Sequence, residues 1–228
     1  SELLPIPPGT LRTCKEEDDC EEFPLNTFLM EHSEVTVAQF ATCLRAGKCQ
    51  RKDVLDYAES EFCNLGAPDR RNHPINCANY FAARDYCTFV GRRLPTLHEW
   101  QFAARGEDQR KYPWGDEEPS CSFSNAHGEK GRGCGTNATW AVGSRGAGKS
   151  SHGMVDMGGN VMEWTSTIFE LPDEDPLGEE IPVEDNPRTK RNHMGGSFAD
   201  APHVQGIDFL CFDSMKAKNI SLGFRCVD

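Results

Sequence analysis

Apolar residues recur at helical spacing in three segments of the chain, and the first of these segments follows a short strand. Residues 28–49 begin with the apolar run Phe-Leu-Met and continue into a pattern in which Val37, Phe40 and Leu44 share one face. Thr36 can cap the start of this helix, and Gly47 can end it. The segment is therefore predicted to be a strand followed by a helix.

Two further helices are predicted downstream. Residues 78–91 place four apolar side chains inward and end on a glycine: Phe81, Ala82, Tyr86, Phe89 and then Gly91. The third helix starts after a Leu-Pro-Thr sequence, where Thr96 and Glu99 match a capping box. Trp100 and Ala103 supply its buried face.

The helical pattern stops at Gly106, after which Gly, Asn, Asp and Ser separate short apolar pieces. This half is predicted to consist of loops and short strands, which gives an α+β domain of low regular structure. We expect the domain to cover residues 28–228 and the Pro-rich residues 1–27 to form an extended lead-in. Trp100, Trp114 and Trp164 are large enough to anchor such a core.

Length and charge narrow the class of protein. A chain of 228 residues suits one large domain, and no apolar run reaches the about 20 residues of a membrane helix, so no membrane insertion is expected. The formal net charge of -12 argues against nucleic acid as a partner. Acidic residues concentrate in residues 170–185, which we interpret as a solvated loop, the alternative being a site for a cation or a basic partner.

Eleven cysteines are more than a cytosolic protein of this length usually has. The sequence contains no C-x-x-C pair, so it gives no indication of a zinc site. Disulfides in an exported protein, whether periplasmic, on the cell surface or secreted, explain them better. The start at Ser1 rather than Met is consistent with a processed form. Three pairs are close enough to bond locally, although spacing does not fix connectivity: Cys14/Cys20, Cys43/Cys49 and Cys121/Cys134. An odd number leaves at least one thiol free or bonded between chains.

Several phrases in order carry a family signature: EVTVAQF, PINCANYFAARDYC, GRRLPTLHEWQFAARG, YPWGDEEP, SNA, VGS, DMGGNVMEWT, GGSF and LGFRC. In this order they resemble the sulfatase-modifying, formylglycine-generating enzyme family, from about Phe28 to Cys226. The resemblance implies a variant of the C-type lectin fold with little regular secondary structure. It also implies a disulfide between Cys87 and Cys226.

The resemblance implies a catalytic cysteine pair that this chain lacks. Enzymes of the family oxidise a substrate cysteine with two cysteines that bind Cu(I) in the loop after a GGSW-like phrase. Here Ser197 of that phrase is kept, but Asp200 and Gln205 stand about where the cysteines would be. Neither side chain can replace a thiolate on Cu(I), so copper is not expected to bind. Cys211 is either the odd thiol or the partner of an N-terminal cysteine.

The same fold serves iron-dependent sulfoxide synthases, which use an H-x-x-x-H-x-E site. No two of the seven histidines here are four residues apart: His32, His73, His98, His127, His152, His193 and His203. A local iron site of that kind is therefore excluded. His203 lies in the loop after GGSF and is either an ordinary surface histidine or part of a site.

The phrase DMGGNVMEW implies a structural calcium site by the same resemblance. Its ligands would be the Asp156 carboxylate, the carbonyls of Gly159 and Val161, and Glu163; the alternative is that the two acids cap turns. Calcium accepts such hard oxygen ligands. Asn125 would belong to a second calcium site.

Three functions remain open. The first is a non-catalytic module that binds a peptide, a glycan or a protein in the former substrate groove, lined by Ser197, Asp200, His203, Gln205 and Asp208. The second is an active formylglycine-generating oxidase that uses Cys211. The third is a different enzyme in which His203 and Asp200 act as acid and base.

Overall fold

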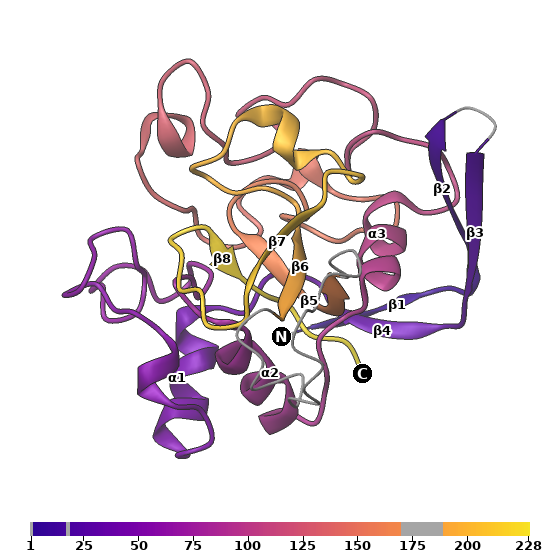
Figure 1. Cartoon of the computed structure of the whole chain (residues 1–228). Helices are drawn as coiled ribbons and strands as arrows, with labels where there is room; N and C mark the ends of the chain where they lie inside the picture. Colours follow the sequence, from indigo (N-terminus) through magenta and orange to yellow (C-terminus); the bar gives the residue numbers. More distant parts are fainter. Residues whose placement is uncertain (1, 17–18, 170–188) are drawn as a thin grey trace, which may run out of the picture.

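The computed structural model describes residues 2–16, 19–169 and 189–228, and it confirms a mixed α+β fold (Figure 1). The described residues form three α-helices, four short 3-10 helices and eight strands. None of the helices among them is long and apolar enough to cross a membrane. The acidic residues 170–185 lie outside the described residues.

The three α-helices lie in the first half of the chain, as predicted: α1 (Val37–Arg45), α2 (Tyr80–Phe89) and α3 (Leu97–Arg105). Each helix is preceded by a capping residue whose side chain accepts a hydrogen bond from a backbone N–H in the first turn. Thr36 caps α1, Asn79 caps α2, and Thr96 forms the predicted capping box with Glu99.

The prediction for the inward face of α2 was partly wrong. Ala82 and Tyr86 are buried, but Phe81 is only partly covered and Phe89 is 37% exposed. The helix instead centres its buried face on Ala83 and Cys87. The reason is the disulfide from Cys87 to Cys226, because it turns this side of the helix towards the C-terminal segment.

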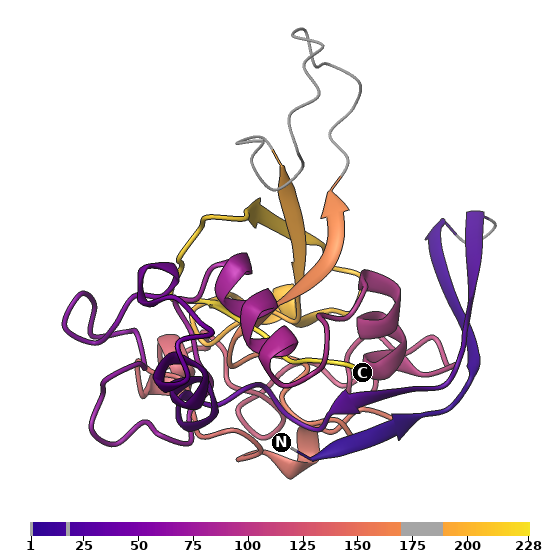
Figure 2. The same cartoon turned by 90° about the horizontal axis from the view of Figure 1, so that it is seen from below.

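Residues 2–16 and 19–27 are largely extended, and they pack onto the rest of the domain. Strand β1 (Leu3–Ile6) pairs antiparallel with β4 (Phe28–Glu31), while β2 (Gly9–Glu16) and β3 (Asp19–Leu25) form a hairpin. Figure 2 shows this hairpin projecting from the body of the molecule. Ile6 and Leu11 are fully buried in the same cluster as Trp100 of α3, so these strands share the domain's core.

The second half contains a four-stranded sheet in the order β7-β6-β5-β8. Its strands are β5 (Met162–Phe169), β6 (Lys190–Met194), β7 (Cys211–Ser214) and β8 (Leu222–Gly223). Only the β5–β8 pair is parallel. Loops connect these short strands, as predicted after Gly106. The described residues also contain four 3-10 helices that the sequence did not predict: η1 (Arg51–Asp53), η2 (Arg132–Gly135), η3 (Gly146–Gly148) and η4 (Pro202–Gln205).

Two of the three tryptophans predicted as core residues are fully buried, in different clusters. Trp164 packs with α1 and α2, and Trp100 packs with the N-terminal strands. Trp114 is the exception, since it lies in neither cluster. It stacks between Tyr112 and Phe123 and donates its Nε1 hydrogen to the Glu117 carbonyl, so it orders a surface loop.

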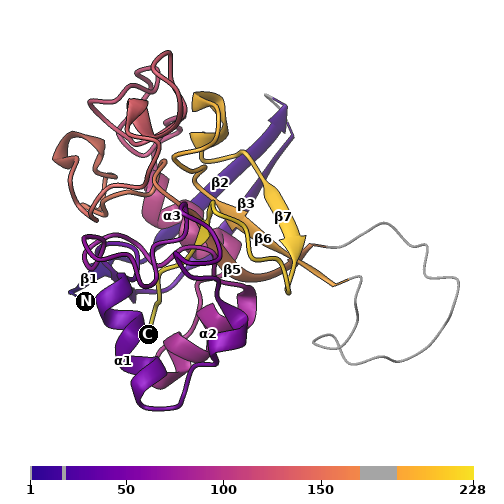
Figure 3. The ribbon, with the colours of Figure 1, turned by 90° about the vertical axis from the view of Figure 1, so that its left-hand side faces the viewer.

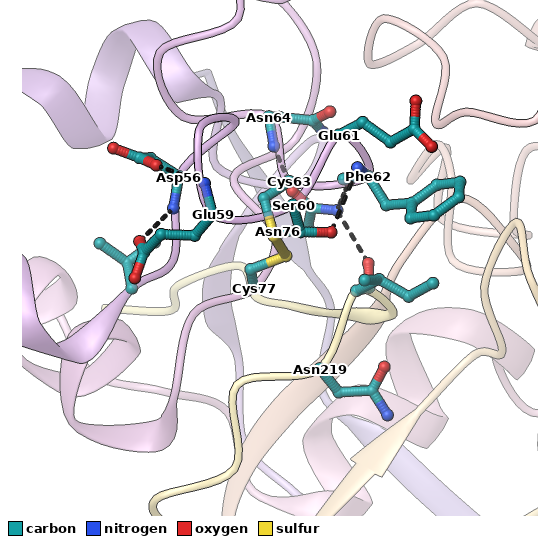
Figure 4. The surroundings of a disulfide bond; sticks show 12 residues. Asp56, Glu59, Ser60, Glu61, Phe62, Cys63, Asn64, Asn76, Cys77 and Asn219 are labelled. Carbon is teal, nitrogen blue, oxygen red and sulfur yellow. Dashed lines mark hydrogen bonds between the residues drawn. A yellow bond between two sulfur atoms is a disulfide. The ribbon is translucent and has the colours of Figure 1, made fainter.

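Ten of the eleven cysteines form five disulfides. These include the three local pairs and the long-range pair expected above: Cys14–Cys20, Cys43–Cys49, Cys121–Cys134 and Cys87–Cys226. The fifth, Cys63–Cys77, was not anticipated (Figure 4). Next to it Asn76 donates to the carbonyls of Phe62 and Ile220, which joins this loop to the C-terminal segment. Cys211 keeps a free thiol.

Candidate functional site

The loop after β6 starts with Gly195 and Gly196, and the first of these has no room for a side chain. Gly195 has φ 93°, and a Cβ there would lie 2.7 Å from the Met157 carbonyl oxygen. Gly159 is equally crowded, because its Cβ would lie 2.5 Å from the Asn125 carbonyl oxygen. The Gly159 N–H donates to the Gly195 carbonyl (2.7 Å). The two Gly-Gly turns are thus bonded to each other, although about 35 residues separate them in sequence.

Ser197 follows directly and holds Asp200. Its fully buried hydroxyl donates to the Asp200 carboxylate and accepts the Ala199 N–H (3.1 Å). The Ser221 hydroxyl lies 2.8 Å away. Asp200 also accepts the His127 N–H on its backbone carbonyl (2.9 Å). Asp200 therefore presents a fixed, half-buried carboxylate in this loop.

The other predicted groove residues point in different directions. Gln205, at the end of η4, is fully buried, and neither of its amide atoms has a hydrogen-bond partner among the described residues. His203 is exposed and lies edge-on to Phe209 (5.6 Å between ring centroids). Asp208 is exposed and pairs with the buried Arg105 of α3. The five residues belong to one loop, but only Ser197 and Asp200 bond to each other.

Cys211 lies on β7, directly opposite His193 of β6. Burial, together with the carboxylates of Asp200 and Asp213, raises the pKa of the Cys211 thiol to about 11. His193 is 4% exposed, and its Nε2 lies 3.4 Å from the Asp213 carboxylate. The only thiol in the protein is therefore protonated at neutral pH and is not the reactive thiolate that nucleophilic or metal chemistry needs.

We expect Cys211 to react slowly with alkylating agents in the native protein. A thiol with a pKa of about 11 holds about a hundredfold less thiolate near neutral pH than one at 9.0. Iodoacetamide labelling, followed by mass spectrometry, should therefore be about a hundredfold slower in the native than in the denatured, unreduced protein. The Cys211→Ser variant should take no label in either state. Equal native and denatured rates would contradict the protonated thiol.

A second group of polar residues is buried between the turn at 156–163 and the C-terminal segment. Arg225 is fully buried, and its Nε and Nη2 both donate to the Glu163 carboxylate (2.7 Å each). Trp100 Nε1 donates to the same carboxylate (2.8 Å). Glu34 is fully buried and accepts from the Asn160 amide (2.8 Å) and the Val161 N–H (3.1 Å).

This buried group carries an excess of acid. Burial raises the pKa of Glu34 well above its ordinary value, and Asp156 and Glu163 add to the effect. Burial also raises the pKa of Asp156, against the opposing N–H of Gly143. Arg225 compensates one of the three carboxylates, so two negative charges remain in the ionised group. Three hydrogen bonds from Arg225 and Trp100 already occupy the Glu163 carboxylate. Among the described residues, no group of three or more His, Cys, Asp or Glu side chains is placed to hold a metal ion.

Asn125 lies against the same turn. Its amide nitrogen donates to the Ala138 carbonyl (3.1 Å) and to the Asn160 side chain (3.2 Å). Its side-chain oxygen is buried and has no hydrogen-bond partner among the described residues. A buried oxygen without a donor fits a cation ligand. The structure places Asn125 beside Gly159, so the two sequence-predicted calcium positions adjoin each other.

Sequence reasoning missed Glu34, Arg225 and His193 as parts of these groups. Two of them lie in phrases of the family signature, because Glu34 is the first residue of EVTVAQF and Arg225 lies in LGFRC. Their partners are more than 60 residues away in the chain, and no local pattern shows such a pairing. His193 carries no motif at all.

Comparison with known proteins places these features in a family. The chain is 28% identical to the formylglycine-generating enzyme of Mycobacterium tuberculosis, with all of this chain and 97% of that protein covered. It is 36% identical to hercynine oxygenase of the same organism, over 42% of this chain and 22% of that protein. It is 31% identical to the inactive C-alpha-formylglycine-generating enzyme 2 of Bos taurus, over 71% of this chain and 52% of that protein.

The fold has solved counterparts as well. The structure of PvdO from Pseudomonas aeruginosa matches with a TM-score of 0.73 at 19% identity, covering 99% of this chain and 93% of that one. The family model of the sulfatase-modifying factor enzyme 1-like domain matches residues 1–228. The chain therefore belongs to this family, the FGE-sulfatase family, over its whole length.

Proposed function

We propose that this protein is a binding module on the scaffold of a formylglycine-generating enzyme and that it does not oxidise cysteine. The proposal rests on one observation above all. The loop after GGSF contains no cysteine pair, and by the resemblance Asp200 and Gln205 stand about where the family's enzymes carry theirs. The ligand would be a peptide, a glycan or a protein held against the loop of residues 197–211.

The chemistry of Cu(I) supports the loss of activity. Cu(I) is a soft ion that prefers thiolate ligands, whereas Asp200 and Gln205 offer hard oxygen. Asp200 is moreover hydrogen-bonded by Ser197, and the single thiol, Cys211, has a pKa raised to about 11 by its burial. A relative that is itself named inactive, the bovine protein, supports the same interpretation.

A turnover assay tests the proposal against the oxidase alternative. The protein is incubated with Cu(I), oxygen, a thiol reductant and a cysteine-containing peptide, with an active formylglycine-generating enzyme as the positive control. We expect the peptide to keep its cysteine, as judged by mass spectrometry. Aldehyde formed by the wild type and lost in Cys211→Ser would establish the oxidase instead.

Restoring the cysteine pair gives a complementary prediction. The double variant Asp200→Cys/Gln205→Cys is expected to bind Cu(I) in competition with a chromogenic chelator, because two thiolates in one loop provide the ligands that the wild type lacks. The wild type and the Asp200→Ser/Gln205→Ser variant are expected to leave the chelator complex intact. Copper uptake by the wild type would overturn our interpretation of the loop.

We also propose that Asp156, the carbonyls of Gly159 and Val161, and Glu163 bind calcium as a structural ion, with Asn125 in an adjoining site. Burial raises the pKa of both Glu34 and Asp156, and a bound Ca²⁺ would stabilise the ionised carboxylates. A saturating ion stabilises the folded state by about 2.7 kcal/mol at a hundredfold excess over Kd. We expect calcium to raise the Tm in a thermal scan, relative to a chelator.

The control variants make the calcium test specific. Asp156→Ala should lose the calcium-dependent rise in Tm, and Asp116→Ala, which removes an exposed carboxylate, should keep it. An equal response to calcium in both variants, or none in the wild type, would contradict the site.

We further propose that the protein works in an oxidising compartment after export, because five disulfides are unusual for a reducing cytosol. Recovery from the cytosolic fraction of its native cells with reduced cysteines would contradict this.

A further inference from the structure

The segment after η4 exposes an unusual concentration of large apolar side chains. Phe209, Leu210 and Phe212 are 40%, 47% and 39% exposed, and Cys211 lies between the last two. Phe169 of β5 stacks on Phe212, with 3.8 Å between the ring centroids. We call these four residues, Phe169, Phe209, Leu210 and Phe212, the apolar patch. Burying the exposed parts of these side chains against a partner is favourable.

The apolar patch borders an edge strand. β7 is at one end of the sheet order β7-β6-β5-β8, and among the described residues it pairs only with β6. In Figure 3 it lies on the outer side of the sheet. Alternate residues of an edge strand point their N–H and C=O groups away from the sheet, where an added strand can pair with them. The other end of the sheet, β8, is buried.

The surroundings of the apolar patch are acidic. The loop at 107–118 touches this region, since the Ile207 N–H donates to the Lys111 carbonyl (3.0 Å). Residues 107–118 and 203–213 contain seven acidic residues against Arg110 and Lys111: Glu107, Asp108, Asp116, Glu117, Glu118, Asp208 and Asp213. Three further basic residues lie in this region: Lys190 over the Phe212 ring, Arg191 opposite Asp213, and Arg105, which pairs with Asp208. The seven acidic residues still exceed these five basic ones. A basic partner would be complementary to this surface.

We propose that β7 and the apolar patch bind an extended segment of a partner protein that is apolar and basic, and that this segment adds a strand to the sheet. Backbone hydrogen bonds to β7 would supply affinity, and alternate side chains would pack on Phe212 and Leu210. The proposal rests on the proposed function, which it deepens by naming the partner's chemistry and by placing the contact at the sheet edge.

A peptide probe tests this directly. The blocked peptide Lys-Val-Lys-Phe-Lys-Val, labelled with a fluorophore, is titrated with the intact protein and followed by anisotropy at low and high salt. We expect saturable binding that weakens with salt. The matched peptide with glutamate in place of lysine should bind at least about tenfold more weakly. Replacing both valines by proline should have a similar effect, because proline cannot complete the strand pairing.

Variants locate the contact. Phe212→Ser and Leu210→Ser should each weaken binding about tenfold, as expected for a central apolar contact. Tyr57→Ser, which removes an aromatic side chain of similar exposure from a different loop, should leave binding unchanged. Circular dichroism of each variant serves as the control for correct folding.

Each outcome of these binding experiments either supports or overturns the edge-strand proposal. Absence of binding, equal binding of the glutamate or proline peptide, or a Tyr57→Ser effect equal to that of Phe212→Ser would overturn the edge-strand proposal. The probe has no cysteine, so it cannot report oxidation. The turnover assay above therefore tests the proposed function separately, and failure of one does not entail failure of the other.

Discussion

Replacement of Arg225 by methionine is expected to lower the free energy of unfolding by about 3–5 kcal/mol, the cost of leaving a buried charge without its partner. All five N–H groups of the guanidinium are used: they reach the Glu163 carboxylate and the carbonyls of Glu31, His32 and Val155. Methionine fills a similar volume but donates none of these bonds. Urea unfolding in calcium-free buffer measures the difference.

Two comparisons separate charge from packing. The double variant Arg225→Met/Glu163→Gln should be less destabilised than Arg225→Met alone, because glutamine removes the orphaned charge and still accepts from Trp100. Lys111→Gln breaks the exposed pair with Glu118 and should leave the free energy of unfolding nearly unchanged, because solvent screens that pair. A double variant that loses the full sum of the two single effects would contradict a charge-based coupling.

The helices could be predicted because their signals are local. Thr36, Thr96 and Glu99 act within their own first turn, so the sequence around each already contains the cap. Phe89 and Trp114 were wrongly predicted to be core residues. The hydrophobicity of a side chain indicates that it tends to be buried, but not whether the fold provides a partner surface that buries it. In α2 the disulfide of Cys87 decides that question, and its partner lies 139 residues away.

In the candidate site, too, one feature of the local sequence could be predicted, and those set by tertiary packing could not. The absence of a cysteine pair after GGSF was visible in one short loop of the sequence. The bond from Ser197 to Asp200, three residues apart, was not predicted. The pairing of Glu163 with Arg225 and the approach of Asn125 to Gly159 are products of tertiary packing. Cys63–Cys77 escaped prediction for a related reason, since spacing alone does not distinguish among several possible partners.

The site's geometry also explains how a loop without the cysteine pair keeps its shape. The Phe198 N–H donates to the Asn160 carbonyl (3.0 Å), and Asn160 in turn binds Glu34. The loop is therefore held by the same buried group that we propose to bind calcium. Loss of the ion should weaken both the turn at 156–163 and ligand binding by the loop, which links the structural and the functional proposals.

Removing the disulfide between Cys87 and Cys226 is expected to have the largest effect of any cysteine substitution. In the chain-entropy model the stabilisation grows with the length of the closed loop, and a separation of 139 residues corresponds to about 5 kcal/mol. Cys43→Ala/Cys49→Ala is the matched control, because both of its sulfurs are also buried but the separation is only 6 residues. Its expected cost is about 2.4 kcal/mol.

Denaturant unfolding of both double-alanine variants measures the difference. Because burial is similar at the two sites, packing losses largely cancel, and the remaining gap of about 2–3 kcal/mol reports loop length. Equal losses would mean that local packing, and not the constraint on the unfolded chain, sets the contribution of these disulfides. A greater loss for the Cys87–Cys226 variant would show that the link between α2 and the C-terminus stabilises the fold mainly by restricting the unfolded state.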